Sequence, residues 1–168
     1  MLFKTLHGSH LYGLAHEGSD KDYYVVLDTQ KKKKAKYARQ SIVDGVDTTV
    51  VDFGTWVNMC QHGTPQALEA MFSSMAEVDE ISNFRQAFRV GDGIRDTYYR
   101  TIDNFLAEED FKRNRHAIRL ALNLRDALRY GRFNPTLSRR ARVWVTFHAK
   151  NMPLDELREF TLDFSQDV

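Results

Sequence analysis

The chain has 168 residues, of which 42% are hydrophobic and 28% are charged, and its formal net charge is +1. This length is enough for one compact domain, or for a small α/β domain with a helical extension. The near-neutral charge neither requires nor excludes a nucleic-acid partner. The single cysteine, Cys60, excludes both an intrachain disulfide framework and a cysteine-based zinc site.

The same sequence features predict where the protein works. Residues 1–5 lack the long apolar core of a signal peptide, and no apolar run approaches the length of a membrane span. One cysteine fits a reducing compartment. We therefore expect a cytoplasmic protein with no membrane partner.

The first third of the chain has the pattern of strands and turns. Residues 2–6 form a short, mostly apolar segment that ends just before Gly8. Residues 22–27 and 47–53 are rich in residues that favour strands, such as valine, tyrosine and threonine. The lysine run at 31–34 is interpreted as a solvent-exposed connection, with contact to a nucleic-acid backbone as the alternative.

From residue 53 onward the pattern becomes helical. Thr64 and Pro65 suit the N-cap and the first position of a helix. The clearest helix covers residues 112–130 and ends at Gly131. Its apolar stripe is formed by Ala117, Leu120, Ala121, Leu124, Ala127 and Leu128. The remaining helices are expected over residues 53–61, 66–74, 81–106 with an interruption near 91–93, 137–149 and 154–163.

Two short motifs near the N-terminus combine residues that can carry chemistry. Gly8 and Ser9 follow a predicted strand, and Asp20 and Asp22 stand at the start of the next one. Side chains at positions i and i+2 of a strand face the same side, so the two carboxylates would lie together. Adjacent carboxylates repel each other and favour a bound cation, and Mg²⁺ prefers such oxygen ligands together with substrate phosphates. Gly8 would let the backbone approach a ligand closely, and Ser9 could hold phosphate oxygens.

A third carboxylate would complete a two-metal site for phosphoryl transfer. Asp47 opens the next predicted strand and is the first candidate, with Asp52 as its rival. The two are five residues apart, and an odd separation places them on opposite faces of one strand. Only one of them can therefore line the site.

The order of these parts resembles a known signature. Gly8-Ser9 followed by Ser19-Asp20-x-Asp22 is similar to the motif of the DNA polymerase β-like nucleotidyltransferase superfamily. The string from His7 to Leu14 resembles a narrower group of bacterial and phage predicted nucleotidyltransferases. Further similarity to that group covers most of the chain, but these matches are less specific than the N-terminal motif. They are Asp47 to Asp52, Trp56, Gly63-Thr64-Pro65, Leu68-Glu69, Lys112, His116, Arg119 and Gly131-Arg132-Phe133.

The resemblance implies an α+β fold, with a small mixed sheet flanked by helices. Residues 1–75 would form the catalytic core, and residues 76–168 a helical portion packed on it. The implied cofactor is Mg²⁺ or Mn²⁺, and the implied substrate is a nucleoside triphosphate. By this resemblance, Asp20, Asp22 and Asp47 are expected to be both metal ligands and catalytic residues. Gly8, Ser9 and Ser19 are expected to bind the nucleotide. Thr64 departs from the asparagine that is more frequent in the group, with little expected effect because it lies in a turn.

Lys112, His116 and Arg119 form a second tier of nucleotide-binding candidates. Their i, i+4, i+7 spacing places them on one face of a helix. This face could bind phosphate or a nucleobase, and the alternative is an ordinary solvated polar surface. Among other residues near the motif, Tyr12 is predicted to lie in the core, with stacking on a base as the alternative. Glu69 is predicted to serve a capping or salt-bridge role, with reach to the site as the alternative. The histidines at 7, 10 and 16 are interpreted as packing or hydrogen-bonding residues rather than metal ligands.

The predicted activity is transfer of a nucleoside monophosphate from a nucleoside triphosphate to a hydroxyl, with release of pyrophosphate. The acceptor stays open between RNA, a protein side chain and a small molecule. The competing hypotheses are an antitoxin-like protein of the same fold that acts on a protein partner, a nucleotide-binding module without turnover, and a nucleic-acid-binding module without catalysis. The intact set of three aspartates argues against lost turnover, and the near-neutral charge argues against a purely nucleic-acid-binding role.

Overall fold

The computed structural model describes residues 1–28, 39–43 and 46–166 and has the predicted α+β composition. It divides into two compact units. The sheet unit comprises residues 1–60, 66–88 and 134–136, and the helical unit comprises the remaining residues. The lysine run at 31–34 lies outside the described residues.

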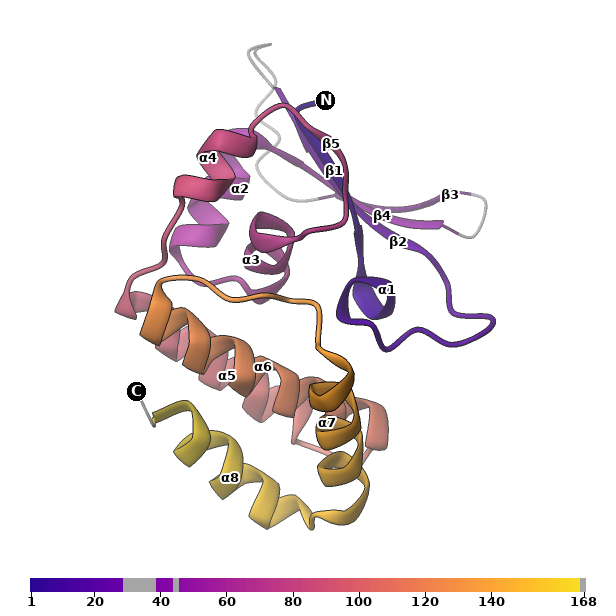
Figure 1. The fold of residues 1–168 in the computed structure, drawn as a ribbon, viewed down its shortest axis with the longest axis vertical. Coiled ribbons are helices and arrows are strands. Elements are labelled where there is room, and N and C mark those ends of the chain that lie inside the picture. Colours follow the sequence, from indigo (N-terminus) through magenta and orange to yellow (C-terminus); the bar gives the residue numbers. More distant parts are fainter. Residues whose placement is uncertain (29–38, 44–45, 167–168) are drawn as a thin grey trace. The chain divides into compact units, whose positions relative to one another are not determined.

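The sheet unit is built on a mixed sheet of five strands in the order β3-β4-β2-β1-β5 (Figure 1). β2 runs parallel to β4 and antiparallel to β1, and the two edge strands are antiparallel to their neighbours. The predicted strands near the N-terminus, at 22–27 and at 47–53 are confirmed. The strand bounds are β1 Phe3–His7, β2 Asp22–Leu27, β3 Arg39–Val43, β4 Val46–Asp52 and β5 Ala76–Asp79.

The helical segments also follow the predicted positions closely. The predicted segment 81–106 is divided by a 3-10 turn at Asp92–Ile94, close to the expected interruption. In the described residues, no helix is both long and apolar enough to cross a membrane. The helices are α1 Gly8–Tyr12, α2 Phe53–Gln61, α3 Pro65–Phe72, α4 Ser82–Ala87, α5 Arg95–Phe105, α6 Phe111–Tyr130, α7 Arg139–Asn151 and α8 Leu154–Gln166.

The boundary between the two parts differs from the one expected at residue 75. Residues 76–88, which contain β5 and α4, belong to the sheet unit. The reason is that β5 pairs with β1 and so completes the sheet at its edge. A strand of only four residues at a sheet edge has too little hydrophobic alternation to be recognised in the sequence. The predicted packing of the helical portion on the core stays a prediction.

The core of the sheet unit lies between one face of the sheet and the helices α2, α3 and α4 (Figure 1). Phe3 on β1 is fully buried and stacks on Trp56 of α2, with ring centroids 5.5 Å apart. The indole of Trp56 donates a hydrogen bond to the carbonyl of Ala67 in α3 at 3.1 Å, so one side chain joins both helices to the sheet. Thr5 on the same strand face bonds Ser73, which follows α3, at 2.6 Å. This face of β1 therefore fixes where α2 and α3 lie.

The helical unit is organised around α6, which contacts α5, α7 and α8. Asp110 caps α6 by accepting a hydrogen bond from the backbone N–H of Arg113 at 2.8 Å. Gly131 ends it with a φ of 70°, a left-handed conformation that glycine adopts without strain. Five residues of the predicted stripe are buried, whereas Leu128 at its end is partly exposed; the buried ones are Ala117, Leu120, Ala121, Leu124 and Ala127.

Arg85 on α4 connects β5 and the end of α3 to the core. Its side chain is only 7% exposed and lies over the ring of Phe3, 4.2 Å from the ring centroid. The guanidinium forms an ion pair with Asp79 of β5 and donates to the carbonyls of Met71 and Ser73. Removing the Arg85 guanidinium would leave the Asp79 carboxylate and the carbonyls of Met71 and Ser73 without this donor.

We therefore expect Arg85→Met to lower the free energy of unfolding by about 3–5 kcal/mol, the range for removing one partner of a buried charge pair. Urea denaturation measures this difference. The matched control is Asn83→Ala on the same helix, since Asn83 is exposed and the change should stay within about 0.5 kcal/mol. Equal midpoints for the two variants would show that Arg85 does not hold β5 in place.

Candidate active site

The first part of the site is the sharp turn from β1 into α1. Gly8 follows β1 directly and has a φ of 60°. A Cβ atom at this position would lie 2.1 Å from an Oδ atom of Asp22, so any other residue would collide with the carboxylate. Residues 8–12 form a short helix, α1, that the sequence analysis did not predict. Gly13, at a φ of 73°, ends it after little more than one turn.

Asp22 and Asp47 form the centre of the site. Asp22 is the first residue of β2, and its partner across the parallel β2–β4 ladder is Asp47. Residues paired across neighbouring strands point to the same face of the sheet, so the two carboxylates lie side by side. The same face carries the buried side chains of Tyr24 on β2 and Val51 on β4. The structure thus brings together Asp22 and Asp47, two of the three aspartates expected as metal ligands.

The electrostatics of Asp22 reflect this crowding. Burial raises the pKa of its carboxyl above the ordinary value, and the charge of Asp47 raises it further. His7 and His10 act in the opposite direction, while Asp20 adds to the repulsion. Asp20 therefore lies close enough to affect Asp22, but it precedes β2 and is exposed to solvent. Strand parity does not apply to Asp20, because it precedes the first residue of β2, and its orientation toward Asp22 stays a prediction.

Asp52, the rival third carboxylate, lies at the other end of β4 and pairs with Leu27. Its Oδ1 accepts a hydrogen bond from the backbone N–H of Thr55 at 2.9 Å, at the start of α2. Burial raises the pKa of Asp52, but hydrogen bonds from Thr55 and from the backbone of residues 52 and 54 together outweigh that effect and lower the pKa overall. Asp52 thus caps a helix and lies far along the strand from Asp22.

A buried polar cluster lies behind Asp22. His7 is the residue paired with Asp22 across the β1–β2 ladder, and it is 7% exposed. Glu69 of α3 is 1% exposed and accepts a hydrogen bond from the hydroxyl of Tyr12 at 2.5 Å. The carboxylate of Glu69 also lies 3.8 Å from Nε2 of His7. Tyr12 is a core residue, as predicted, and it links α1 to α3 through Glu69.

His7 and Glu69 lie near the site, although neither is among the predicted site residues. The sequence predicts packing or hydrogen bonding for His7. For Glu69 it predicts a capping or salt-bridge role, with reach to the site as the alternative. The signal available for His7 was its place at the end of a strand, directly before the Gly8 turn. Glu69 had no local signal, since its proximity to His7 depends on how α3 packs on the sheet.

The serines of the motif have different surroundings. The hydroxyl of Ser19 accepts a hydrogen bond from the backbone N–H of His16 at 2.9 Å, which closes a turn. The ring of His10 on α1 bonds the Ser19 carbonyl at 3.3 Å, so α1 holds the loop that carries Asp20. Ser9 is half-buried, and its hydroxyl makes no hydrogen bond within the described part of the chain. Ser9 can therefore take a ligand oxygen, whereas Ser19 already serves the turn.

The second-tier residues belong to α6 in the helical unit. Lys112 is exposed, the ring of His116 stacks on Phe105 of α5 at 5.3 Å, and Arg119 is only 3% exposed. The three do not form a uniformly solvated strip, because the helix face turns from solvent to interior between Lys112 and Arg119. Their predicted role in binding a nucleotide stays a prediction.

The carboxylates of Asp22 and Asp47 have the hard oxygen donors that suit Mg²⁺. Among the described residues, no group of three or more histidine, cysteine, aspartate or glutamate side chains is arranged to hold a metal ion alone. Mg²⁺ is commonly bound by one or two carboxylates with substrate phosphates and water completing its shell. The paired aspartates beside Gly8 fit this open kind of site better than a closed protein cage.

No protein-family model matches the sequence, and no curated protein matches it either. The resemblance to polymerase β-like nucleotidyltransferases therefore depends on the motif residues themselves and on their placement. Those residues are Gly8, Ser9, Asp20, Asp22 and Asp47.

The raised pKa of Asp22 predicts how stability depends on pH. The folded protein holds the Asp22 proton more tightly than the unfolded chain, so stability falls as pH rises through the range above 3.8. Asp22→Asn lacks this ionisation, and at about pH 7 it should melt at the wild-type temperature or slightly above. Thermal melts at a series of pH values measure the effect. Asp28→Asn, an exposed change just after β2, is the control and should not raise the midpoint. A markedly lower midpoint for Asp22→Asn would contradict the repulsion.

Two glycines with positive φ provide a second, sterically matched test. Gly8 has a φ of 60° and Gly18 a φ of 87°, but a Cβ atom would meet nothing within 4 Å at Gly18. Gly18→Ala should therefore cost only about 1–2 kcal/mol for its left-handed backbone. Gly8→Ala should cost more and should displace Asp22, which denaturant unfolding and loss of cation binding would both report. Equal effects in the two variants would argue against the close approach of Gly8 to Asp22.

Proposed function

We propose that this protein is a metal-dependent nucleotidyltransferase. It would transfer a nucleoside monophosphate from a nucleoside triphosphate to a hydroxyl acceptor. The observation that carries the proposal is the in-register pairing of Asp22 with Asp47, beside a glycine turn that leaves room only for a backbone. The order of these parts along the chain, and their similarity to the nucleotidyltransferase motif, support the same activity.

The carboxylates would bind and orient, and Asp47 would also accept a proton. Asp22 and Asp47, with Asp20 adjacent, would hold a divalent cation. This cation would neutralise the charge of the triphosphate. The acceptor oxygen would attack the α-phosphorus, and the bond from that phosphorus to the bridging oxygen of pyrophosphate would break. The proton of the acceptor hydroxyl would pass to the Asp47 carboxylate, and pyrophosphate would leave. Positioning supplies much of the rate in such reactions.

The turn at Gly8 and Ser9 would hold the phosphates. The absence of a side chain at Gly8 lets the backbone approach the carboxylate pair and any phosphate that it holds through a cation. The Ser9 hydroxyl, half-buried and without a hydrogen bond to a described residue, would contact a phosphate oxygen. Lys112, His116 and Arg119 are proposed as further nucleotide contacts, and the exposed Lys112 can be replaced by alanine with little effect on folding.

A matched pair of aspartate variants on one strand tests the activity. Wild-type protein is incubated with each α-labelled nucleoside triphosphate, Mg²⁺ or Mn²⁺ and a cell extract, and labelled product is measured. Asp47→Asn should lower transfer by about 100-fold or more, as expected when a group that acts on the reacting atoms is removed. Asp52→Asn should keep most of the activity, because asparagine is also a good helix N-cap.

A thermal shift with ligands gives an independent readout. A ligand that binds only the folded state stabilises it, by about 2.7 kcal/mol at one hundred times its dissociation constant. Mg²⁺ and a triphosphate together should raise the melting temperature of the wild type and of Asp52→Asn, but not that of Asp22→Asn. An unchanged ligand shift in Asp22→Asn would falsify the proposed location of the site. A shift without labelled product would indicate a nucleotide-binding module instead of a transferase.

A further inference from the structure

Helix α7 in the helical unit carries a concentration of positive charge. Its sequence from Arg139 to Asn151 contains three arginines and one lysine, and no acidic residue. The whole chain has a net charge of only +1, so this helix departs strongly from the average. Within the described residues, Arg139, Arg140 and Lys150 form no ion pair and no side-chain hydrogen bond. These cations are therefore available to an external anion.

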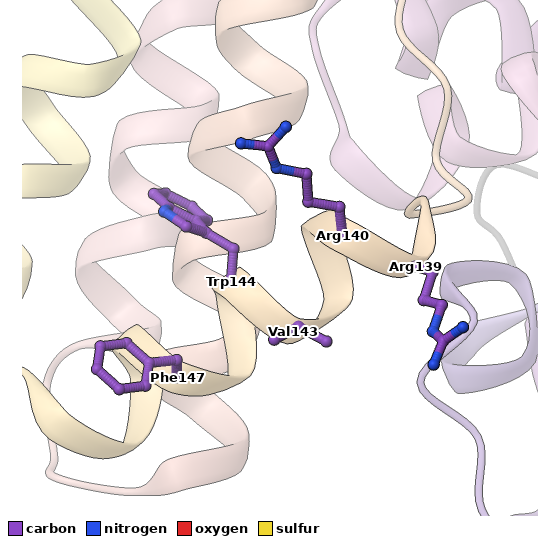
Figure 2. A pocket seen from close by; sticks show the side chains of 5 residues that line it. All are labelled: Arg139, Arg140, Val143, Trp144 and Phe147. Carbon is purple, nitrogen blue, oxygen red and sulfur yellow. The ribbon is translucent and has the colours of Figure 1, made fainter.

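The same helix exposes apolar side chains between its charges. Val143 is 66% exposed and Phe147 is 60% exposed, which makes them two of the most exposed large apolar residues of the described chain. Together with Arg139, Arg140 and Trp144 they line a shallow groove of about 650 Å³ (Figure 2). The five side chains follow one another along α7, so the groove has an aromatic end and a cationic end, where the side chains of Arg139 and Arg140 point in different directions (Figure 2).

Trp144 is held firmly at the aromatic end. Its indole packs against Phe160 and Phe164 of α8, with ring centroids 5.5 Å and 5.7 Å away, and against His148 at 4.6 Å. The ring is nevertheless only half-buried, and it lines the groove. A rigid aromatic surface that still faces solvent can stack on a flat partner without a large loss of side-chain entropy.

We propose that the groove on α7 binds a single-stranded nucleic acid. Arg139 and Arg140 would hold phosphates through their planar guanidinium groups, and Phe147 and Trp144 would stack on unpaired bases. From Arg139 to Phe147 the helix rises about 12 Å at 1.5 Å per residue, so the groove could contact more than one nucleotide of a strand. This binding does not depend on the carboxylate chemistry of the sheet unit.

Charge selects this occupant over the other partners that an exposed apolar groove can bind. A second copy of the chain would place one α7, with four cations and no acidic residue, against another, and like charges repel. A membrane surface would be contacted through a continuous apolar helix face, whereas the exposed apolar residues of this groove are Val143 and Phe147 alone. A polyanion with flat, unstacked bases complements both ends of the groove.

The experiment measures fluorescence anisotropy of a labelled oligouridylate of about twelve nucleotides, within the site sizes typical of single-strand binding. The double variant Arg139→Ala with Arg140→Ala should weaken binding at low salt and reduce the slope of log K against log salt by about 1.4, at about 0.7 per lost phosphate contact. The charge-matched control is Arg100→Ala with Arg129→Ala, which removes two exposed arginines from other helices and should leave the slope unchanged.

Two further measurements separate stacking from charge. Phe147→Ser should weaken binding about tenfold at every salt concentration without changing the slope, because it removes a base-stacking ring. The chain has two tryptophans, and Trp56 is fully buried, so quenching of tryptophan emission on binding should come from Trp144 and disappear in Trp144→Phe. Asp22→Asn should bind the oligonucleotide as tightly as the wild type, which separates this proposal from the proposed transferase activity.

Several outcomes would overturn the proposal. One is an equal loss of binding in the charge-matched control, which would indicate attraction by net charge alone. Another is a duplex that binds as tightly as the single strand, together with no effect of Phe147→Ser. Binding to phosphatidylserine vesicles in the absence of oligonucleotide binding would assign the groove to a membrane surface. Self-association that Phe147→Ser abolishes, again without oligonucleotide binding, would assign it to a second copy.

Discussion

The arrangement of the sheet unit depends on one electrostatic constraint, the pairing of Asp22 with Asp47 across the parallel β2–β4 ladder. Burial raises the pKa of the Asp22 carboxyl above its ordinary value, and the charge of Asp47 beside it raises that pKa further. Farther along the same strands, the buried side chains of Tyr24, Val26 and Val51 provide hydrophobic contacts that offset the repulsion. The sheet thus holds in register two charges that would separate in a flexible loop.

The residues behind Asp22 explain why this geometry can be maintained. The hydrogen bond from Tyr12 to the buried Glu69 fixes α1 against α3, and α1 begins at Gly8. Gly8 in turn lies where a side chain would collide with Asp22. The buried Glu69 on α3 therefore sets the position of the Gly8 turn, which borders the proposed phosphate site. In this sense Tyr12 and Glu69 are positioning residues rather than ligands.

The sequence predicted those parts whose signal is local. The strand at 22–27 is dense in β-formers, and the helix α6 has a regular apolar stripe with Asp110 and Gly131 at its ends. The pairing of Asp22 with Asp47 was predictable because strand parity and the order of segments allow few alternatives. Other parts depend on pairing or packing between distant segments, for which no periodicity in the chain gives a signal. These parts are the edge strands β3 and β5, the short α1 and the approach of Glu69 to His7. Asp20 shows the limit of parity, since the rule applies only inside the strand.

Net charge illustrates a similar limit for binding arguments. A total of +1 argues against a purely nucleic-acid-binding role, yet that total is the sum of a helix with four cations and no acid and a remainder of opposite sign. Charges act on a ligand over about one Debye length, roughly 8–10 Å at physiological ionic strength, so a ligand at α7 responds to the local excess and not to the sum. The carboxylate pair and the cationic groove belong to different units, and each would present a local field of its own. The near-neutral total is therefore compatible with both a cation-binding site and a polyanion-binding surface on one chain.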